Sequence, residues 1–452
     1  MLTERMAGPA IRAWHIATAL AGEHDVQLVT TTRLCEVSSP SFRVRSVNQD
    51  ELRSVEAWTD VMVVQGYVLV DNPFLRSSPK VMVVDLYDPM HLESLELTRG
   101  EEDSQRQIAT RSVTAIMNDQ LGRGDFFMCA SVKQRDFWLG HLTALGRVNP
   151  LTYDDDETFH SLISVVPFGL PDNPPVSSGR VLRGVLPGIE DEDDVLLWGG
   201  GIYNWFDPIT LIEAVDRLRR SRPQVRLFFL GLTHPNPDVP KMRMVGAARA
   251  RAEELGLTGR HVFFNDGWVP YEDRQSYLLE ADVGVSTHLQ HLETAFSFRT
   301  RILDYMWAQL PIVASEGDAF ADLIQSERLG ITVPVGDLSA LESALLRILA
   351  DPDLAATCRA NLERVARDYT WSKVLVPLVE FCRSPRRAPD LVDPQISRDL
   401  EARSRHRPAA ATSWRRDLET AGTHLRVGGL PLLLTRARGR VDRMLAGLRE
   451  RS

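Results

Sequence analysis

The sequence predicts an α/β protein made of two successive units, each with a parallel sheet covered by helices on both faces. Short, continuously apolar runs rich in Val, Ile and Phe alternate with amphipathic stretches, which is the pattern of buried parallel strands separated by helices. The alternation pauses at a proline-rich stretch, 171–179, and then begins again. A length of 452 residues accommodates two such units and an appendage.

The two units are assigned to residues 1–174 and 175–382. The strands predicted for them are 26–30, 61–64, 80–87, 126–131 and 164–169, followed by 194–201, 225–231, 261–267, 282–287 and 310–315. Helices at 339–350 and 372–382 close the second unit. Ligands of doubly wound sheets bind beyond the carboxyl ends of the strands, so we expect the site in a cleft between the units.

The beginning of the chain departs from this pattern. A doubly wound unit normally opens with a buried strand before its first glycine turn. Here only MLTER precedes the turn in MAGPAIR at 6–12. We therefore predict a shortened or missing first strand at residues 1–5, with a true start further upstream as the alternative.

The net charge of −9 conceals a division between body and tail. Residues 383–452 hold 16 Arg against 8 Asp and Glu, so the rest of the chain carries −17. An acidic body argues against a general nucleic-acid binder. Prolines predict a linker at 383–408, and leucines at three- or four-residue spacing among arginines predict a basic amphipathic helical tail at 409–452. Such a helix binds an anionic membrane surface, its own protein or a partner, and the pattern leaves these alternatives open.

Several classes of protein are disfavoured. The four cysteines lie far apart without a CxxC pair, which argues against a disulfide framework or a zinc site. No apolar run approaches the roughly 20 residues of a membrane helix, and no secretory leader is evident. We expect a cytoplasmic protein, with peripheral attachment to the inner face of the membrane as an option for the tail. His288 and His291 share a loop without a third ligand, so no metal is expected.

Two glycine turns are candidate phosphate sites. Gly8 in MAGPAIR begins a helix whose exposed N–H groups attract an anion, and Arg12, one turn on, adds a full charge. Gly200 and Gly201 follow a strand in LLWGGG. That turn lacks the Lys and Ser/Thr of a P-loop, so a nucleotide hydrolase is disfavoured. The alternative for Gly8 is a turn required only by packing.

The stretch 286–315 contains the largest number of candidate ligand-binding side chains. Ser297, Arg299 and Arg301 at a helix start can neutralise a diphosphate. Glu293 and Asp304 can accept hydrogen bonds from sugar hydroxyls. The alternative for Arg301 and Asp304 is a solvated helix face.

Four segments together resemble a known family: MAGPAIR, SVVPFGLPD, GWVPYEDRQSYLLEADVGVST and DYMWAQLPIVAS. Between about residue 5 and residue 382 the chain is similar to the retaining GT-B glycosyltransferases of the bacterial NDP-sugar-dependent family 4, or group 1, type. The resemblance implies two Rossmann-like domains facing a central cleft. Residues 1–174 would bind the acceptor, and residues 175–382 the nucleotide-sugar donor.

The resemblance also implies roles for single residues. Gly8 and Arg12 would face the donor diphosphate or the acceptor, and the backbone of Val269 and Pro270 would contact the nucleobase. Asp304 would hold the ribose. The family's second carboxylate has no clean match, and Glu293 is assigned to the donor sugar.

Asp88 and His91, beyond the strand at 80–87, take the catalytic positions near the anomeric carbon that the resemblance implies. Asp85 is the further candidate there. The alternative is that Asp88 caps a helix and that His91 is a surface residue.

One departure from the family concerns the diphosphate. Members usually place an Arg and a Lys after the glycine turn, where this chain has Tyr203, Asn204, Trp205, Phe206 and Asp207. We expect Arg299 and Arg301 to substitute from the opposite side of the cleft, because a departing diphosphate requires positive charge or N–H donors.

The implied activity is transfer of a sugar from a nucleotide-diphosphate sugar to an acceptor hydroxyl, with retention and without an obligate metal or other cofactor. The acceptor would be a lipid, a polysaccharide such as that of the cell envelope, or a natural product. Two alternatives stay open because the Arg and Lys are absent. One is an inactive, transferase-like binding or scaffold protein, and the other is a pseudo-glycosyltransferase that uses a non-sugar donor.

Overall fold

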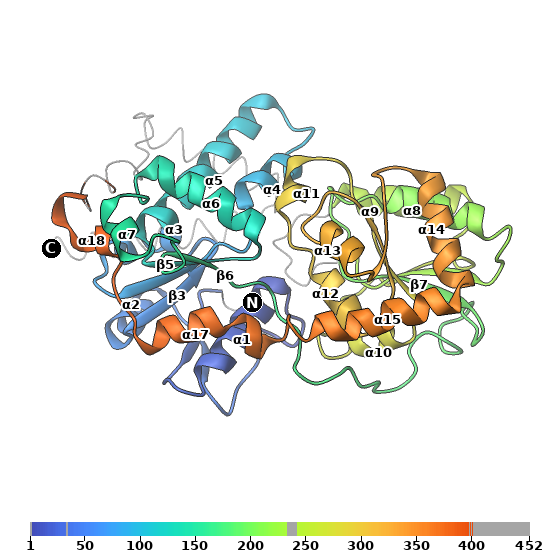
Figure 1. Cartoon of the computed structure of the whole chain (residues 1–452), viewed down its shortest axis with the longest axis horizontal. Helices are drawn as coiled ribbons and strands as arrows, with labels where there is room; N and C mark the ends of the chain where they lie inside the picture. The colour runs from blue at the N-terminus through green and yellow to red at the C-terminus, as the bar shows by residue number, and fades with distance from the viewer. Residues whose placement is uncertain (1, 33–34, 233–241, 397, 399, 401–452) are drawn as a thin grey trace.

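The computed structural model describes residues 2–32, 35–232, 242–396, 398 and 400. It shows two α/β halves side by side, with the chain crossing between them twice (Figure 1). The predicted tail at 409–452 and the end of the predicted linker lie outside the described residues, so a basic amphipathic helix there stays a prediction.

The C-terminal half contains a six-stranded parallel sheet in the order β12-β11-β10-β7-β8-β9. Its strands are β7 (Asp194–Trp198), β8 (Val225–Phe229), β9 (Val262–Phe264), β10 (Val283–Ser286), β11 (Ile312–Ser315) and β12 (Gly330–Val333). Its helices are α8 (Pro208–Leu218), α9 (Arg243–Glu254), α10 (Arg274–Leu279), α11 (Leu292–Phe296), α12 (Thr300–Trp307), α13 (Ala321–Ser326), α14 (Leu338–Ala350) and α15 (Pro352–Ala366). The strand order reverses between β7 and β10, which is where doubly wound sheets open a crevice for ligands.

The N-terminal half contains a four-stranded parallel sheet in the order β3-β4-β5-β6 and a separate parallel pair, β1-β2. The strands are β1 (Gln27–Thr30), β2 (Arg43–Ser46), β3 (Val61–Gln65), β4 (Val81–Asp85), β5 (Phe126–Cys129) and β6 (Ile163–Val165). The helices are α1 (Gly8–Leu20), α2 (Gln49–Trp58), α3 (Val68–Asp71), the 3₁₀ turn η1 (Pro73–Ser77), α4 (Met90–Leu97), α5 (Asp103–Arg123), α6 (Val132–Leu145) and α7 (Pro150–Asp155).

The fold class predicted from the sequence is confirmed, and each of the ten predicted strands is present. The sequence missed β2 and β12. Both are four-residue strands, RVRS and GITV, without a continuous apolar run. At the start of the chain, residues 2–7 form a single parallel bridge, between Leu2 and Cys35, and no strand. This agrees with the expected shortening of the first strand.

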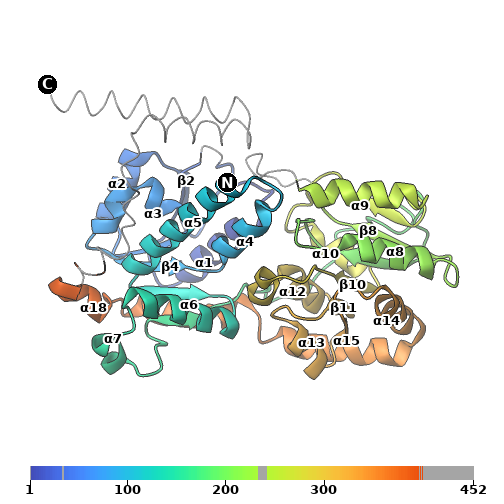
Figure 2. The same ribbon diagram turned by 90° about the horizontal axis from the view of Figure 1, so that it is seen from above.

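The end of the described chain returns to the N-terminal half. After α15 come α16 (Trp371–Val374), α17 (Val376–Arg383) and α18 (Pro389–Val392), and α17 and α18 lie beside that half (Figures 1 and 2). Phe381 stacks on Phe126 of β5, with ring centroids 4.5 Å apart. Asp390 is fully buried and pairs with Arg147, with an N–O distance of 2.6 Å. Over its described residues, the stretch 383–408 is therefore not a free linker. Asp390 pairs with Arg147, which is buried in the N-terminal half.

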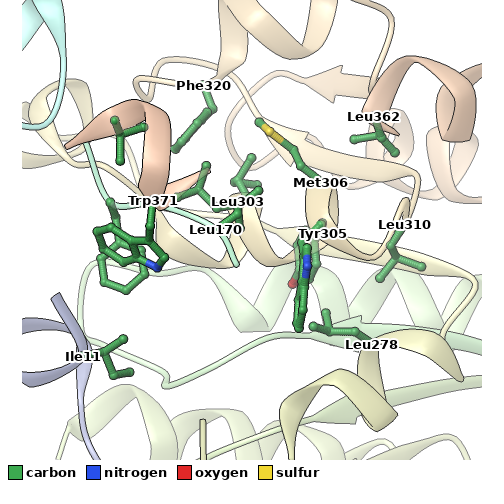
Figure 3. Close-up of a cluster of buried hydrophobic side chains, with 14 of the residues drawn as sticks. Ile11, Leu170, Leu278, Leu303, Tyr305, Met306, Leu310, Phe320, Leu362 and Trp371 are labelled. Atoms are coloured by element: carbon green, nitrogen blue, oxygen red, sulfur yellow. The ribbon is translucent and has the colours of Figure 1, made fainter. Parts of the chain in front are cut away.

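The two crossings share one apolar core. Leu170, in the first crossing, exchanges backbone hydrogen bonds with Tyr369 and Trp371 in the second. Around them the core joins Ile11 of α1 to side chains of the C-terminal half, including Met306 and Phe320 (Figure 3). The halves are thus packed together at the base of the cleft.

The Arg147–Asp390 pair gives a test of this docking. Replacing Asp390 by Ala leaves a buried guanidinium without its counter-charge, for which we expect a loss of about 3–5 kcal/mol in the free energy of unfolding of the N-terminal half. Glu363→Ala, which removes an exposed i,i+4 pair with Arg367, should cost about 0.5 kcal/mol or less. Urea denaturation of both variants measures the difference, and equal midpoints would show that the returning segment contributes nothing.

Candidate active site

The loops at the carboxyl ends of both sheets meet between the two halves. Tyr87, just after β4, donates its hydroxyl to the backbone oxygen of Phe298 at 3.1 Å. Gln134, in the first turn of α6, is fully buried and donates to the backbone oxygens of Tyr87 and Phe296, at 2.9 and 2.8 Å. One amide group thus holds a loop of each half. Sequence analysis missed this role, because a lone glutamine in a helix is not distinctive.

Arg12 is buried, and its hydrogen bonds are used within the N-terminal half. Its guanidinium pairs with both carboxylate oxygens of Asp85, at 2.6 and 3.1 Å. It also donates to the backbone oxygens of Val166 and Pro167, at 2.8 and 2.7 Å. With 1% of its surface exposed, Arg12 joins α1 to the ends of β4 and β6. The expectation that Arg12 contacts a diphosphate is wrong for this structure, because its hydrogen bonds and its burial serve the scaffold.

Gly8 begins α1, as predicted, and is half-buried. Ala7 at the N-cap offers no side-chain cap, so no side chain accepts the first N–H groups of the helix. A Cβ at Gly8 would meet no atom within 4 Å. The glycine is therefore not required by packing in this structure.

Two carboxyl groups beyond β4, those of Asp88 and Glu93, have raised pKa values. Burial, the charge of Asp85 and the charge of Glu293 raise the pKa of Asp88 to about 7, against a lowering by Arg12. Burial, Asp88 and Glu293 raise the pKa of Glu93 well above its usual range. Clustered, desolvated carboxyls are typical of functional sites. The sequence analysis did not name Glu93 as a site residue. Its electrostatic interaction with Asp88 and Glu293 is seen only in the structure.

His91 lies apart from these carboxyl groups in its contacts. Its ring stacks on Phe137 of α6, with centroids 5.1 Å apart, and lies near Trp138 and His141. Burial, and then His141, lower the pKa of His91 to about 4, so the ring is neutral at pH 7. Its Nδ1 is buried without a hydrogen-bond partner. The expected place of His91 near the anomeric carbon stays a prediction, and its ring packs among aromatic residues of α6.

Glu293 and Arg299 form a buried pair on the other side of the cleft. Arg299 donates to both carboxylate oxygens of Glu293, at 3.1 and 2.9 Å. Ser297 also donates its hydroxyl to this carboxylate. Glu293 is 2% exposed. It is therefore held by its own neighbours, and a sugar hydroxyl would have to share an oxygen that is already bonded.

Arg301 lies against the glycine turn within the C-terminal half, and not across a cleft from it as the sequence analysis expected. Its Nη2 donates to the backbone oxygen of Gly201 at 2.7 Å, and its guanidinium stacks on Trp198 and Phe206, 4.3 and 4.2 Å from the ring centroids. Burial lowers its pKa to about 10, so it stays charged at pH 7. Gly200 has a φ of +86°, which favours glycine.

Two guanidinium atoms in this cluster are buried without partners, Nε of Arg299 and Nη1 of Arg301. Arg299 also stacks on Phe206, with its guanidinium carbon 4.7 Å from the ring centroid. The aromatic residues that stand where the family has Arg and Lys therefore support two arginines from α12 and the residue before it. A buried N–H group without a partner costs free energy, and a bound acceptor would remove that cost.

A second group surrounds Asp304. Its Oδ1 accepts from Nε of Arg274 at 2.9 Å, while about a quarter of its side chain is exposed. Arg274 lies between the rings of Tyr271 and Trp307, 3.4 and 4.7 Å from their centroids. The predicted nucleobase contacts, Val269 and Pro270, are half-buried in the loop just before Tyr271. The structure thus brings this loop and Asp304 together through Arg274, which the sequence analysis missed.

The described residues include no group of three or more His, Cys, Asp or Glu placed to hold a metal ion. Of the two histidines weighed as ligands, His291 caps α11 by accepting from the N–H of Thr294. His288 is buried beside Leu289 and Ser315. Among the described helices, none is long and apolar enough to cross a membrane.

Comparison with known proteins identifies the architecture. Residues 193–351 match the family described as Glycosyl transferases group 1. A D-inositol 3-phosphate glycosyltransferase from Jonesia denitrificans is 25% identical over 202 residues, which cover 44% of this chain and 45% of that protein. A phosphatidyl-myo-inositol mannosyltransferase from Mycolicibacterium smegmatis is 29% identical over 164 residues, 36% of this chain and 38% of that protein. The chain thus spans less than half the length of these curated relatives.

Solved structures agree over most of the chain. A sucrose-phosphate synthase from Thermosynechococcus elongatus superposes with a TM-score of 0.61 at 17% identity and covers 83% of this chain and 93% of its own. HepE from Anabaena, solved with UDP and glucose, gives a TM-score of 0.61 at 14% identity, with 85% and 98% covered. The fold is therefore GT-B, and residues 193–351 form a glycosyl transferases group 1 domain.

The raised pKa of Asp88 predicts a pH dependence of stability. The folded state holds the proton up to about pH 7 and the unfolded state only to about pH 4. The stabilising contribution of protonated Asp88 is thus complete below pH 4 and is lost as the pH rises through 7. We expect Asp88→Asn, which stays neutral, to gain in Tm relative to the native protein between pH 5.5 and pH 8. Exposed Asp136→Asn is the control, and parallel Tm profiles for Asp88→Asn and native protein would contradict the assignment.

Proposed function

We propose that the protein is a glycosyltransferase that moves a sugar from a nucleotide-diphosphate sugar to an acceptor hydroxyl. The observation that carries the proposal is the pair of unpartnered, buried N–H groups of Arg299 and Arg301, whose guanidinium groups both stack on Phe206, with Arg301 beside the turn at Gly200 and Gly201. A diphosphate develops negative charge as it departs, and donors fixed in a dry site stabilise that charge. The nucleotide-binding relative from Anabaena supports a nucleotide diphosphate as the donor's leaving part.

In the proposed reaction the acceptor oxygen forms a bond to the anomeric carbon while the bond from that carbon to the diphosphate oxygen breaks. The leaving diphosphate takes the bonding electron pair and the acceptor proton. Attack and departure on the same face would retain the anomeric configuration. Protein carboxylates then need only orient the acceptor, which suits Asp88, half-buried at the cleft side of β4.

For the donor, we place the nucleobase against the backbone of Val269 and Pro270 and the ribose at Asp304. Asp304 retains one carboxylate oxygen outside its bond to Arg274 and is partly exposed, as a ribose contact requires. The sugar would lie toward Glu293 and Ser297. No obligate metal is proposed, because the charge of Arg301 and the unpartnered N–H of Arg299 can stabilise the departing diphosphate.

The acceptor we favour is a polyol hydroxyl carrying a phosphate or lipid, because two partial relatives act on inositol compounds. A cell-envelope product would fit this class. The second candidate is an inactive binding protein or a pseudo-glycosyltransferase with a non-sugar donor. The observation that favours the second candidate is that Arg299 is already paired with Glu293.

Substitution of Arg301 by Met tests the diphosphate role. The change keeps an apolar stem on Trp198 and Phe206 but removes the charge, so we expect kcat/KM for nucleotide-sugar turnover to fall by about 10²–10³. The assay measures nucleotide release with a panel of nucleotide sugars and inositol acceptors in the presence of EDTA. Arg220→Met, at an arginine side chain that is 75% exposed, is the control.

Three results would separate the candidates. Equal turnover by native protein and Arg301→Met would refute the role of Arg301. Nucleotide binding without release from any sugar donor would favour the inactive binding protein. Release only from a cyclitol-like donor would favour the pseudo-glycosyltransferase.

We also propose that the basic segment 409–452 attaches the protein peripherally to an anionic membrane on the cytoplasmic side, where a lipid-linked acceptor would be available. Deletion of 409–452 should reduce sedimentation with vesicles that contain anionic lipid, and raising the salt concentration should reduce binding of the full chain. Vesicles of neutral lipid are the control. Undiminished binding after the deletion would contradict the proposal.

A further inference from the structure

His15, on α1 of the N-terminal half, packs against two aromatic rings from outside that half. Its imidazole stacks on Trp371 of the second crossing, with ring centroids 4.5 Å apart and an interplanar angle of 14°. The ring of Tyr271, in the loop before α10, meets the imidazole at 65° with centroids 6.1 Å apart. Aromatic pairs in these two arrangements contribute free energy beyond the area that they bury. His15 therefore connects α1 to the loop in which we place the nucleobase contacts.

The position of Trp371 is fixed by the backbone around it. Its N–H donates to the backbone oxygen of Leu170 at 2.9 Å. A Cβ at Gly169 would lie 2.5 Å from Cδ2 of the Trp371 ring, so this ring packs directly on the backbone of the first crossing. Trp371 also belongs to the apolar core that joins the two halves (Figure 3). The imidazole of His15 is thus stacked on a ring that both crossings keep in place.

Tyr271 contacts Arg274 with both its ring and its backbone. The guanidinium carbon of Arg274 lies 3.4 Å from the centroid of the Tyr271 ring, and Nη1 donates to the backbone oxygen of Tyr271. The ring of Trp307 lies 4.7 Å from the same carbon. Nε of Arg274 donates to Oδ1 of Asp304 at 2.9 Å. A series of direct contacts therefore runs from His15 through Tyr271 and Arg274 to Asp304.

We propose that His15 is a positioning residue for the donor nucleotide, whose ring holds Tyr271 and, through Tyr271, the Arg274–Asp304 pair in the orientation that receives the ribose. The proposal rests on the proposed function, which places the ribose at Asp304. About a quarter of the Asp304 side chain is exposed, so its bond to Arg274 directs the other carboxylate oxygen. A group that is already held in its bound orientation loses less conformational entropy when the ligand binds.

His15 performs this role as a neutral ring. Burial first, and then the charge of Arg274, lower the pKa of His15 to about 4, against a raising by Asp172. The imidazole is therefore uncharged at pH 7 and does not repel the guanidinium of Arg274. A phenyl ring can then replace the imidazole in both aromatic contacts, whereas a methyl group cannot.

Binding of nucleoside diphosphates to the full chain tests the proposal. UDP, GDP and ADP are titrated by calorimetry, and the one that the native protein binds most tightly is the probe. We expect His15→Ala to raise Kd about 2- to 10-fold, which corresponds to the loss of an aromatic pair. His15→Phe should restore the native Kd. His160→Ala, at an exposed histidine, is the control. Where His15→Ala does not fold, His15→Leu, which keeps apolar volume without a ring, takes its place.

A double-mutant cycle with Asp304→Asn separates positioning from a general loss of stability. If His15 acts through Asp304, adding His15→Ala should raise Kd by a smaller factor in Asp304→Asn than in the native protein. Equal Kd values for native protein and His15→Ala, an equal loss with His15→Phe, or the same factor in both backgrounds would overturn the inference and leave the proposed function intact. Failure of the native protein to bind any of the three nucleotides would overturn both.

Discussion

The balance of charge in the cleft constrains the rest of the site. Four carboxyl groups, Asp85, Asp88, Glu93 and Glu293, lie within electrostatic reach of one another, and Arg12 and Arg299 face them. Burial first, and then the charges of neighbouring carboxylates, raise the pKa values of Asp88 and Glu93. Protons on Asp88 and Glu93 reduce the negative charge of this cluster.

That constraint bears on how a diphosphate could be accommodated. An incoming anion would meet an acidic cleft unless the carboxyls were neutral or paired, and both conditions hold. Arg12 neutralises Asp85, Arg299 neutralises Glu293, and Asp88 and Glu93 retain protons. Arg301 is left with an open N–H beside the glycine turn. Under the proposed function, neutral or paired carboxyls and the free N–H of Arg301 would together take the place of an Arg and a Lys after the glycine turn.

The sequence predicted the strands well and the partners of charged residues poorly. Continuous apolar runs identified ten strands, because burial on both faces leaves a local signature. Arg12 was assigned to the ligand because nothing local shows that Asp85, 73 positions away, pairs with it. Gln134 and Arg274 were missed for the same reason, since their roles depend on contacts between distant loops. The expected diphosphate role of Arg301 stays a prediction, and its contact with the glycine turn of its own half was not foreseen.

A crystal structure of the full chain with a nucleotide diphosphate bound would locate the leaving group relative to Arg301. We expect the diphosphate within hydrogen-bond distance of Nη1 of Arg301 and of the turn at Gly200, with the ribose at Asp304. A nucleotide bound away from Arg301 with that guanidinium still unpartnered, or no nucleotide bound at saturating concentration, would contradict it.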